Sequence, residues 1–414
     1  MQIFDILLER GFIAKNEDGT PKQVTNPEIR DILNSKSITA YIGFDPTASS
    51  FHVGNLLQIM ILSHLQRAGH RPIVVVGGGT GLIGDPSGKT EMRKMLTLEK
   101  VQENMSKQKE QFKRYIDFSE GKALMVNNAD WLLGFNYIDF LRDYGRHFSV
   151  NRMLTADCIK NRLETGLSFL EFNYMILQSY DFLHLHKTYG CLLQMGGDDQ
   201  WGNICSGIEL IRRVEGKECY GITCPLLTTA SGSKMGKTEK GAVWLDAELF
   251  SPYEYYQYWR NVDDRDVIKC LSLFTFLDME EIRKLSQLKD AQINEAKEVL
   301  AFEATKITHG EKAALQAQQD AKSLFGEQKT GDSIPTVEIP LEEIQKGIWV
   351  IELIKRSGLE TSNSEARRLV QKGGAYINQD KIDSIDLQVT EKYVSNGEMI
   401  LRAGKKRYVR VLVK

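Results

Sequence analysis

Long apolar runs are missing from this sequence of 414 residues: no stretch approaches the roughly 20 consecutive apolar residues that a membrane-spanning helix needs. Proline is also scarce, with nine residues, while an apolar content of 42 % and a charged content of 26 % are ordinary for a globular protein. Asp5 and Glu9 interrupt the apolar N-terminal stretch, which argues against a secretory or import signal. We therefore expect a cytoplasmic protein that does not enter a membrane.

Metal-ligand patterns are missing as well. The six cysteines form no C-x-x-C pair and have no histidine at the spacing of a zinc site, so we expect reduced, mostly buried thiols. His184 and His186 are two positions apart and would face different sides of a helix. The sequence therefore predicts no metal site of the protein's own.

Charge is distributed unevenly along the chain. The formal net charge is only -2, but the segment from Lys355 to Lys414 holds 13 Lys or Arg residues against 7 Asp or Glu residues. A basic module within an otherwise acidic chain predicts an acidic partner for that module, nucleic acid first.

The N-terminal half has the pattern of a parallel sheet. The stretches "SITAYIGF", "GNLLQIMILSHLQRAG" and "RPIVVVGGG" predict a strand, a helix and a second strand, which make a βαβ unit. Further helices and the short strand "CLLQMGG" follow. We predict an α/β fold with a Rossmann-like parallel sheet over residues 1–250.

The rest of the chain has a different pattern. Strand signals disappear over residues 251–325, which predicts an all-α domain, and the polar, proline-containing residues 326–347 predict a linker. Residues 348–414 then predict a small α+β domain. Within it, Ser362 and Glu365 have capping-box spacing before a helix, and short β-like runs follow.

Two glycine motifs resemble nucleotide-binding signatures but fail in detail. "GTGLIG" follows a strand, as a dinucleotide fingerprint does, yet "DPSG" comes next and would interrupt the required helix. "IGDPSGKT" resembles a P-loop, but Ile83 stands where the first glycine belongs. We therefore expect neither an NAD site nor a P-loop.

Two other stretches suit nucleotide phosphates better. In "YIGFDPTASSFHVGN" a glycine at a predicted helix start leaves room for a base or phosphate, and Thr47 and His52 can donate hydrogen bonds. In "SGSKMGKTEKG" Lys234 and Lys237 could place two ammonium groups on a polyphosphate. Taken singly, the first stretch could equally be a turn with a surface histidine and the second a solvated charged loop.

The two stretches together resemble the HIGH and KMSKS signatures of class I aminoacyl-tRNA synthetases. With "GLIGDPSGK", "EFNYMILQSYD" and "GGDDQWGN", they occur in the order seen in bacterial-type tyrosyl-tRNA synthetases, and the tail "SNSEARRLVQKGGAYINQDKI" is similar to the small RNA-binding domain of that family. Three positions depart from the pattern: Asn55 replaces the second histidine of HIGH, Gly236 replaces the first serine of KMSKS, and Asp198 stands where a small residue is expected.

The helix "EFNYMILQSYDFL" indicates a binding wall on its own evidence of spacing. Tyr174, Gln178 and Asp181 lie at i, i+4 and i+7, so three polar groups share one face of an apolar helix. Alone, this face could be a satisfied core network or a solvent face. Beside the other motifs it predicts a pocket wall for a polar aromatic ligand.

The resemblance implies a role for each matched residue. Asp181 and Tyr41 would bind the tyrosine hydroxyl, while the ammonium would be held by Tyr174, Gln178 and Asp85, with Gln200 near the carboxylate. The adenosine side would be lined by Gly43, Asp45, Gly54, Asn55, Gly197 and Asp199, and the catalytic donors to phosphate would be Thr47, His52, Lys234 and Lys237. Lys89, Arg93 and Asn128 would lie near the nucleotide or the mobile loop.

The implied reaction is ATP-dependent ligation of L-tyrosine to tRNA(Tyr) through tyrosyl-adenylate, with Mg²⁺ carried on ATP. The attacking carboxylate is already ionised and needs no general base. Phe169 matches a homodimer interface position, and tRNA contacts are expected from Arg367, Arg368, Lys372, Arg402, Lys405, Lys406 and Arg407. The alternatives are a non-catalytic RNA-binding protein on a synthetase-like scaffold and, nearer, tryptophan specificity, which the paired hydroxyl-binding residues disfavour.

Overall fold

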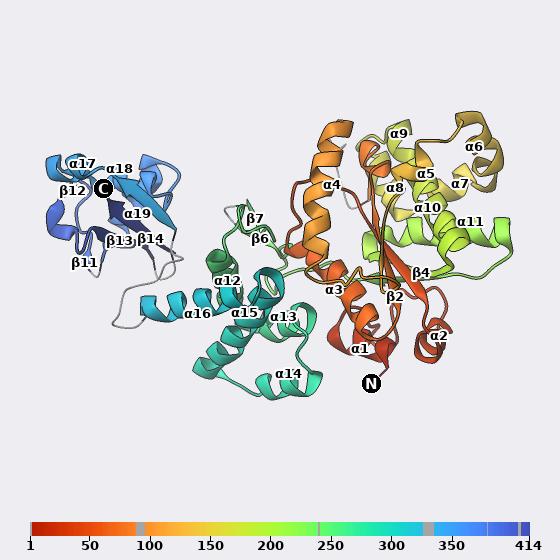
Figure 1. Cartoon of the computed structure of the whole chain (residues 1–414), viewed down its shortest axis with the longest axis horizontal. Helices are drawn as coiled ribbons and strands as arrows, with labels where there is room; N and C mark the ends of the chain where they lie inside the picture. Colours follow the sequence, from red (N-terminus) through yellow and green to blue (C-terminus); the bar gives the residue numbers. More distant parts are fainter. Residues whose placement is uncertain (1, 88–95, 239–240, 326–334, 379, 405–406) are drawn as a thin grey trace. The chain divides into compact units, whose positions relative to one another are not determined.

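The chain forms two compact units, Met1–Ala314 and Leu315–Lys414 (Figure 1). A computed structural model describes residues 2–87, 96–238, 241–325, 335–378, 380–404 and 407–414. Among these residues no helix is long and apolar enough to span a membrane.

A five-stranded parallel sheet forms the centre of the first unit. Its strands lie in the order β3-β2-β1-β4-β5. Because the strand order reverses between β1 and β4, a crevice is expected at the carboxyl ends of these two strands. The strands are β1 (Thr39–Phe44), β2 (Arg71–Val76), β3 (Leu124–Asn127), β4 (Cys191–Gly197) and β5 (Tyr220–Cys224).

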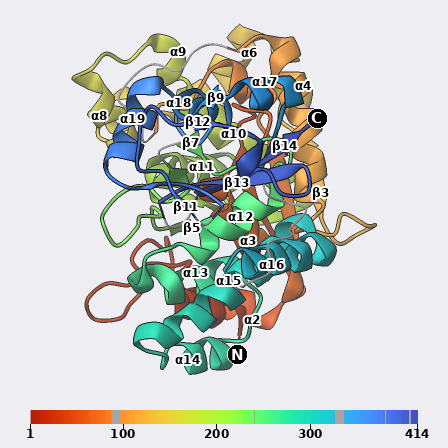
Figure 2. The same ribbon diagram turned by 90° about the vertical axis from the view of Figure 1, so that its left-hand side faces the viewer.

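Helices cover both faces of this sheet, with α3 and α4 on one face and α10 and α11 on the other (Figures 1 and 2). This division follows from right-handed crossovers that run in opposite directions from β1 and from β3. The helices before residue 216 are α1 (Ile3–Arg10), α2 (Ile29–Ser35), α3 (Val53–Arg67), α4 (Leu98–Phe112), α5 (Ala129–Leu132), α6 (Tyr137–Asp143), α7 (Val150–Leu154), α8 (Asp157–Leu163), α9 (Phe169–Phe172), α10 (Tyr174–Tyr189) and α11 (Trp201–Glu215).

The predicted βαβ unit is confirmed as β1, α3 and β2. Val74 and Val76 are fully buried, as an apolar strand covered on both faces requires. On the face of α10 and α11, Tyr41 and Ile73 pack with Phe182. The glycine motif after β2 forms only the single 3-10 turn Thr80–Leu82, which agrees with the predicted absence of a long dinucleotide-binding helix.

Helices make up the described chain from Pro252 to Phe325, as the sequence predicted. A small two-stranded sheet, β6 (Lys237–Thr238) and β7 (Gly241–Ala242), precedes them. The predicted domain boundary at residue 250 stays a prediction, because both sides of it lie in one compact unit. The helices are α12 (Pro252–Arg260), α13 (Val267–Phe274), α14 (Met279–Leu285), α15 (Ile293–His309) and α16 (Glu311–Phe325).

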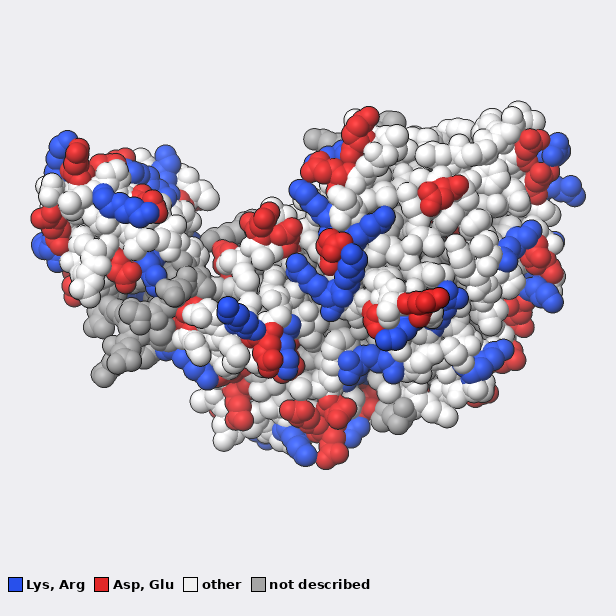
Figure 3. All heavy atoms as spheres, viewed as in Figure 1, with Lys and Arg blue, Asp and Glu red and all other residues white. Residues whose placement is uncertain are grey.

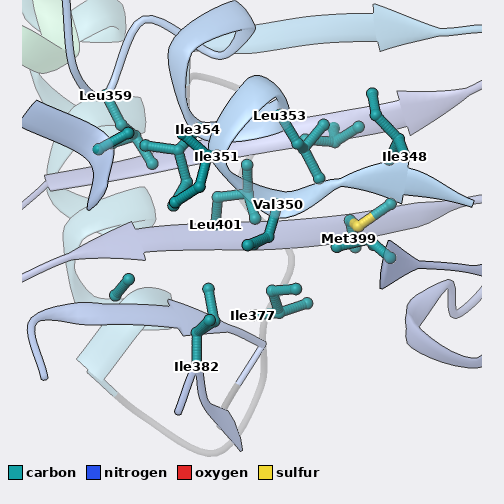
Figure 4. Close-up of a cluster of buried hydrophobic side chains, with 14 of the residues drawn as sticks. Ile348, Val350, Ile351, Leu353, Ile354, Leu359, Ile377, Ile382, Met399 and Leu401 are labelled. Atoms are coloured by element: carbon teal, nitrogen blue, oxygen red, sulfur yellow. The ribbon is translucent and has the colours of Figure 1, made fainter. Parts of the chain in front are cut away.

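The second unit is built on another five-stranded sheet, in the order β11-β10-β13-β14-β8. Side chains of α18, among them Val350 and Ile351, pack toward Leu401 and Ile377 of this sheet (Figure 4). Its elements are β8 (Thr336–Ile339), α17 (Leu341–Lys346), β9 (Ile348–Trp349), α18 (Val350–Arg356), α19 (Asn363–Gln371), β10 (Ala375–Ile377), β11 (Asp380–Lys381), β12 (Gln388–Val389), β13 (Glu398–Ala403) and β14 (Arg407–Val413).

Part of the stretch predicted as a linker is folded into this sheet. β8 pairs in parallel with β14, and Ile339 of β8 is fully buried. The polar composition and the two prolines, Pro335 and Pro340, indicated a linker, but they stand at the two ends of a four-residue edge strand, where proline removes no ladder hydrogen bond. α17 follows within the same stretch.

Candidate active site

A cavity of about 300 Å³ lies at the carboxyl ends of β1 and β4, the crevice expected from the strand order. Tyr41 to Asp45 line one side and Gln194 to Gly196 line the other. The cavity brings together thirteen of the residues that the sequence predicted, namely Tyr41, Gly43, Asp45, Thr47, His52, Asn55, Asp85, Asn128, Tyr174, Gln178, Asp181, Asp199 and Gln200.

Asp181 lies at the buried end of the cavity, with both carboxylate oxygens held. Trp131 Nε1 donates to one oxygen at 2.8 Å, and Asn128 Nδ2 donates to the other at 2.9 Å. Burial nevertheless raises the pKa of Asp181 from 3.8 to about 7, because the hydrogen bonds only partly offset the loss of water around the charge. The charged carboxylate is therefore destabilised by its burial, and a hydrogen bond from a ligand hydroxyl would stabilise it.

Unlike the oxygens of Asp181, two other polar atoms at this end of the cavity have no hydrogen-bond partner in the described part of the chain. They are the Tyr41 hydroxyl and Gln194 Oε1, from residues that are 1 % and 2 % exposed. Their strands pair at this point, Tyr41 opposite Gln194. Burial, and then the negative charge of Asp181, raise the pKa of Tyr41, so its hydroxyl is a neutral donor. Buried polar atoms without partners are costly, and a polar ligand would satisfy them.

The middle of the cavity is an interconnected set of polar side chains. Asp45 accepts hydrogen bonds from Thr80 Oγ1 at 2.7 Å and from the Tyr174 hydroxyl at 2.9 Å. A second path runs from Gln178 Nε2 to Gln200 Oε1 at 3.1 Å and from Gln200 Nε2 to Asp85 Oδ2 at 2.7 Å. These carboxylates make the middle of the cavity suitable for a cationic ligand group.

His52 is the N-cap residue of helix α3 and lines the cavity. Its Nδ1 accepts the Gly54 N–H at 3.0 Å, which assigns the ring hydrogen of neutral His52 to Nε2 as a donor. A Cβ at Gly54 would come within 2.8 Å of the His52 ring, so glycine is needed there. Asn55 completes a capping box, since its Oδ1 accepts the His52 N–H at 3.1 Å. The departure from HIGH at Asn55 thus has a structural role.

The loop that carries Lys234 and Lys237, called the lysine loop below, packs against the start of α3. Gly236 has a left-handed φ of +82°, and a Cβ there would lie 3.1 Å from Gly54 N. The chain then runs antiparallel to residues 51–53, with Val53 N–H donating to Val243 O at 3.0 Å. The structure thereby joins the two signature stretches, which are about 180 residues apart.

Some predicted residues do not line the cavity. They are Lys234, whose side chain is exposed, and the two glycines Gly54 and Gly197. At Gly197 a Cβ would come within 2.6 Å of Asp199 Oδ1, so the glycine makes room for that carboxylate. Partial burial, and then the charges of Asp85 and Asp198, raise the pKa of Asp199. The Lys237 side chain and residues Lys89, Arg93, Lys405 and Lys406 lie outside the described part of the structure.

The cations predicted to contact tRNA differ in their surroundings within the second unit, whose surface carries both basic and acidic side chains (Figure 3). Arg367, Arg368 and Lys372 are exposed on and just after α19. Arg402 stacks on the Tyr376 ring at 3.7 Å, whereas Arg407 is paired with Glu360 at 2.6 Å. The α19 residues are therefore the more accessible candidates for phosphate contacts.

Sequence reasoning missed several residues of the cavity. Gln194 could have been found as the polar residue inside an apolar strand, but Thr80, Gln58 and Gln108 carry no comparable signal. Trp131 reaches Asp181 from a four-residue helix that no motif marks. Asn128, which the resemblance associated with the nucleotide or the loop, lies beside Asp181.

Comparison with known proteins agrees with this geometry. A family model described as tRNA synthetases class I (W and Y) matches residues 33–326, and one described as Tyrosine--tRNA ligase SYY-like C-terminal domain matches residues 327–411. The tyrosine--tRNA ligase of Acetivibrio thermocellus is 56 % identical, over 99 % of this chain and 98 % of the relative. The chain belongs to the tyrosine–tRNA ligase family. A second relative with that name, from Caldanaerobacter subterraneus, is 55 % identical over the full length of both chains.

Solved structures extend the family assignment to the fold. A C-terminally truncated mitochondrial tyrosyl-tRNA synthetase from Aspergillus nidulans superposes with a TM-score of 0.68 at 30 % identity, covering 78 % of this chain and 94 % of that one. A tryptophanyl-tRNA synthetase from Encephalitozoon cuniculi has a TM-score of 0.54 at 13 % identity over 76 % of this chain and 87 % of that one, a likeness of fold alone. The predicted family and fold class are confirmed.

Proposed function

We propose that this chain ligates L-tyrosine to tRNA(Tyr) with ATP, through a tyrosyl-adenylate intermediate, and releases pyrophosphate and AMP. The observation that carries the proposal is the closed end of the cavity, where the Asp181 carboxylate and the unpartnered Tyr41 hydroxyl face one space. A phenol hydroxyl can donate to the carboxylate and accept from Tyr41 at once. The non-catalytic alternative has no support in the comparisons.

The pocket would select tyrosine because any ligand without a phenol hydroxyl leaves Asp181 and Tyr41 without the group that can bond to both. Phenylalanine would bury Asp181 and Tyr41 without a hydroxyl between them, and such a mismatch costs this class of enzyme, by an established value, a factor of about 10⁵. Tryptophan would place a ring nitrogen where Tyr41 needs an acceptor, and an indole N–H only donates. The hydroxyl-binding pair therefore supports tyrosine over both competitors.

The substrate's charged groups fit the middle of the cavity. Asp85, Tyr174 and Gln178 would hold the ammonium, and Gln200, already bonded to Gln178 and Asp85, would lie near the carboxylate. The adenosine side would be lined by Gly43, Asp45, Gly54, Asn55, Gly197 and Asp199.

Side chains that donate hydrogen bonds to the phosphates would stabilise the negative charge that grows on the leaving pyrophosphate. Thr47 and His52 lie at the cavity, and Lys234 and Lys237 come from the loop that packs beside it. The tyrosine carboxylate attacks the α-phosphate, so the carbon–oxygen–phosphorus link forms as the bond to pyrophosphate breaks. Mg²⁺ would arrive on the ATP phosphates as part of the substrate, and among the described residues no group of three or more acidic, His or Cys side chains could hold a metal ion.

The second unit would bind tRNA through Arg367, Arg368, Lys372, Arg402, Lys405, Lys406 and Arg407. Because β8 is a strand of its sheet and α17 follows directly, the test deletes residues 326–414 and leaves the helical region intact. We expect the truncated chain to form tyrosyl-adenylate but not to charge tRNA. Normal charging by the truncated chain would remove the proposed role of this unit.

A homodimer and a cytoplasmic location belong to the same proposal. Side chains of residues 133–169 include six apolar ones that are at least half exposed. A surface of this kind favours association with another chain. The apolar residues are Leu133, Tyr137, Ile138, Val150, Leu163 and Phe169. The five cysteines with described side chains are free, as expected in a reducing compartment.

The decisive experiment is exchange of labelled pyrophosphate into ATP with tyrosine, phenylalanine or tryptophan. Exchange with tyrosine alone is the expected result, since only tyrosine satisfies Asp181 and Tyr41 together. Exchange with phenylalanine at a similar rate would contradict the assignment of the hydroxyl-binding pair. No exchange with any amino acid by folded protein would contradict the proposed activity.

A further inference from the structure

Three amide side chains on α4 hold the backbone of the turn between β1 and α3. Asn104, Gln108 and Gln111 lie at i, i+4 and i+7, so they share one face of the helix, and they are 1 %, 2 % and 3 % exposed. A buried helix face of this kind normally carries apolar residues, and polar ones there need partners.

Each amide bonds to a different part of residues 46–51. Asn104 Nδ2 donates to Pro46 O at 2.8 Å, and Gln108 Nε2 donates to Ala48 O at 2.8 Å. Gln111 Oε1 accepts the Phe51 N–H at 2.9 Å. The turn belongs to no helix or strand, so these side chains replace the backbone partners that regular structure would supply.

The opposite side of the turn is held by the chain that follows the lysine loop. Leu245 N–H donates to Phe51 O at 2.8 Å, and Val53 N–H donates to Val243 O at 3.0 Å. The turn is therefore held between the α4 amides and residues 243–245. Thr47 lies on this turn, His52 follows it directly, and both line the cavity.

Packing alone does not account for the amides. Asn104 Oδ1 and Gln108 Oε1 are buried and have no hydrogen-bond partner among the described residues. A leucine or methionine would fill the same space without burying an unpaired oxygen. Proteins tend to depart from the usual rules of core packing and hydrogen bonding at functional sites, where the departure has a use.

We propose that Asn104, Gln108 and Gln111 are positioning residues for ATP, which set the turn so that Thr47 and His52 meet the phosphates. The inference rests on the proposed function for the roles of Thr47 and His52. Asn104 does not line the cavity, so it can act on ATP only through Pro46 and the turn.

The test compares Asn104→Leu with Gln102→Leu, an exposed position on the same helix. We expect Asn104→Leu to lower kcat/KM for ATP about 10- to 100-fold in pyrophosphate exchange, because small displacements of catalytic groups have effects of this size. The KM for tyrosine should stay within about twofold, since the tyrosine end is held by other residues. Gln102→Leu should match the wild type in both.

Hydrogen exchange of the peptide covering residues 46–53 gives a readout that needs no activity. It should speed up in Asn104→Leu and not in Gln102→Leu, while peptides of β1 and β2 stay protected. If Asn104→Leu does not fold, Gln111→Met carries the same two measurements, because Gln111 also holds the turn and does not line the cavity.

Unchanged ATP kinetics in a variant whose turn exchanges faster would overturn the proposal, as would equal losses for ATP and tyrosine. An unchanged rate of hydrogen exchange in the peptide covering residues 46–53 of Asn104→Leu would overturn the proposal as well. If the wild type itself shows no pyrophosphate exchange, the proposed function fails, and the hydrogen-exchange measurement alone decides whether the amides hold the turn.

Discussion

The two ends of the active-site cavity are built in opposite ways. At the tyrosine end, Asp181 and Tyr41 are almost fully buried, and Asp181 is held by Asn128 and Trp131. At the phosphate end, Thr47 and Lys234 are exposed. Under the proposed function, the difference would mean that the groups that select tyrosine are already in place in the unliganded protein, whereas the charges for pyrophosphate come from its surface.

Physical chemistry explains the contrast. A missing hydroxyl is rejected strongly only where the unpaired protein groups have no water to turn to, so the tyrosine end must be dry and rigid. Pyrophosphate must leave after each turnover, so cations that stay hydrated and approach from a loop suit it better. The predictions below alter one end at a time.

The largest effect is expected from Asp181→Ala at the tyrosine end. It removes the carboxylate that would accept the substrate hydroxyl and leaves Asn128 and Trp131 without their shared partner, so kcat/KM for tyrosine should fall about 10³- to 10⁴-fold in pyrophosphate exchange, with the KM for ATP nearly unchanged. Asp130→Ala, which removes an exposed carboxylate two positions after Asn128, serves as the control. Equal losses for tyrosine and ATP would contradict the separation of the two ends.

Lys234→Ala tests the phosphate end. Loss of one donor to the developing charge should lower kcat about 10²- to 10³-fold while the KM for tyrosine stays the same. Lys217→Ala removes an exposed lysine elsewhere in the unit and should change neither constant. A raised KM for tyrosine in Lys234→Ala would contradict the assignment of Lys234 to the phosphate end of the cavity.

Asp181→Asn tests the strain at the tyrosine end without ligand. The raised pKa, about 7 against an ordinary 3.8, means that folding takes up a proton between these values, so this stability is fully present below pH 4 and is lost as the pH rises through 7. Asparagine cannot titrate, although its NH2 group would face one of the two donors, Asn128 or Trp131. The stability of the wild type relative to the variant should therefore fall by on the order of 2 kcal/mol between pH 5.5 and pH 8.

Urea unfolding of the protein truncated after residue 325, at both pH values, measures this difference in the free energy of unfolding. The same difference between wild type and variant at both pH values would show that the carboxylate is not the titrating group.

The smallest effect is expected from Gly236→Ala. Alanine at a φ of +82° costs about 1–2 kcal/mol, and its Cβ would also press on Gly54 N at 3.1 Å. Gly232→Ala is a matched control in the same loop, because Gly232 has a φ of +84° but no atom within 4 Å of a Cβ. Thermal unfolding should show a similar backbone cost in both variants, while only Gly236→Ala should raise the KM for ATP, by several-fold.

Identical ATP kinetics in the two glycine variants would mean that the contact between Gly236 and the start of α3 has no role in nucleotide binding.

The sequence predicted the cavity well where short motifs carry the chemistry. Tyr174, Gln178 and Asp181 lie on one helix, so their shared face follows from helical spacing alone, and all three line the cavity. It failed where the composition was ambiguous: "TVEI" between two prolines looked like part of a linker because an edge strand of four residues carries too few side chains for a clear alternation.

The residues around the motifs were beyond sequence reasoning for a different reason. Trp131 reaches Asp181 from 50 positions away, and Asn104 reaches Pro46 from 58 positions away. Nothing in the local pattern of either residue indicates its partner, because the contact exists only after the sheet has brought the elements together.

By itself, then, the sequence determined the βαβ core, the helical region, the family and the motif residues, because periodicity, turn chemistry and ordered motifs are local properties of a chain. Only the tertiary structure decided which of these residues share a cavity, which of their polar atoms stay unpartnered, and what holds them. Burial and hydrogen bonding depend on neighbours that are distant along the chain, and those neighbours set the pKa of Asp181 and the shape of the turn at Thr47.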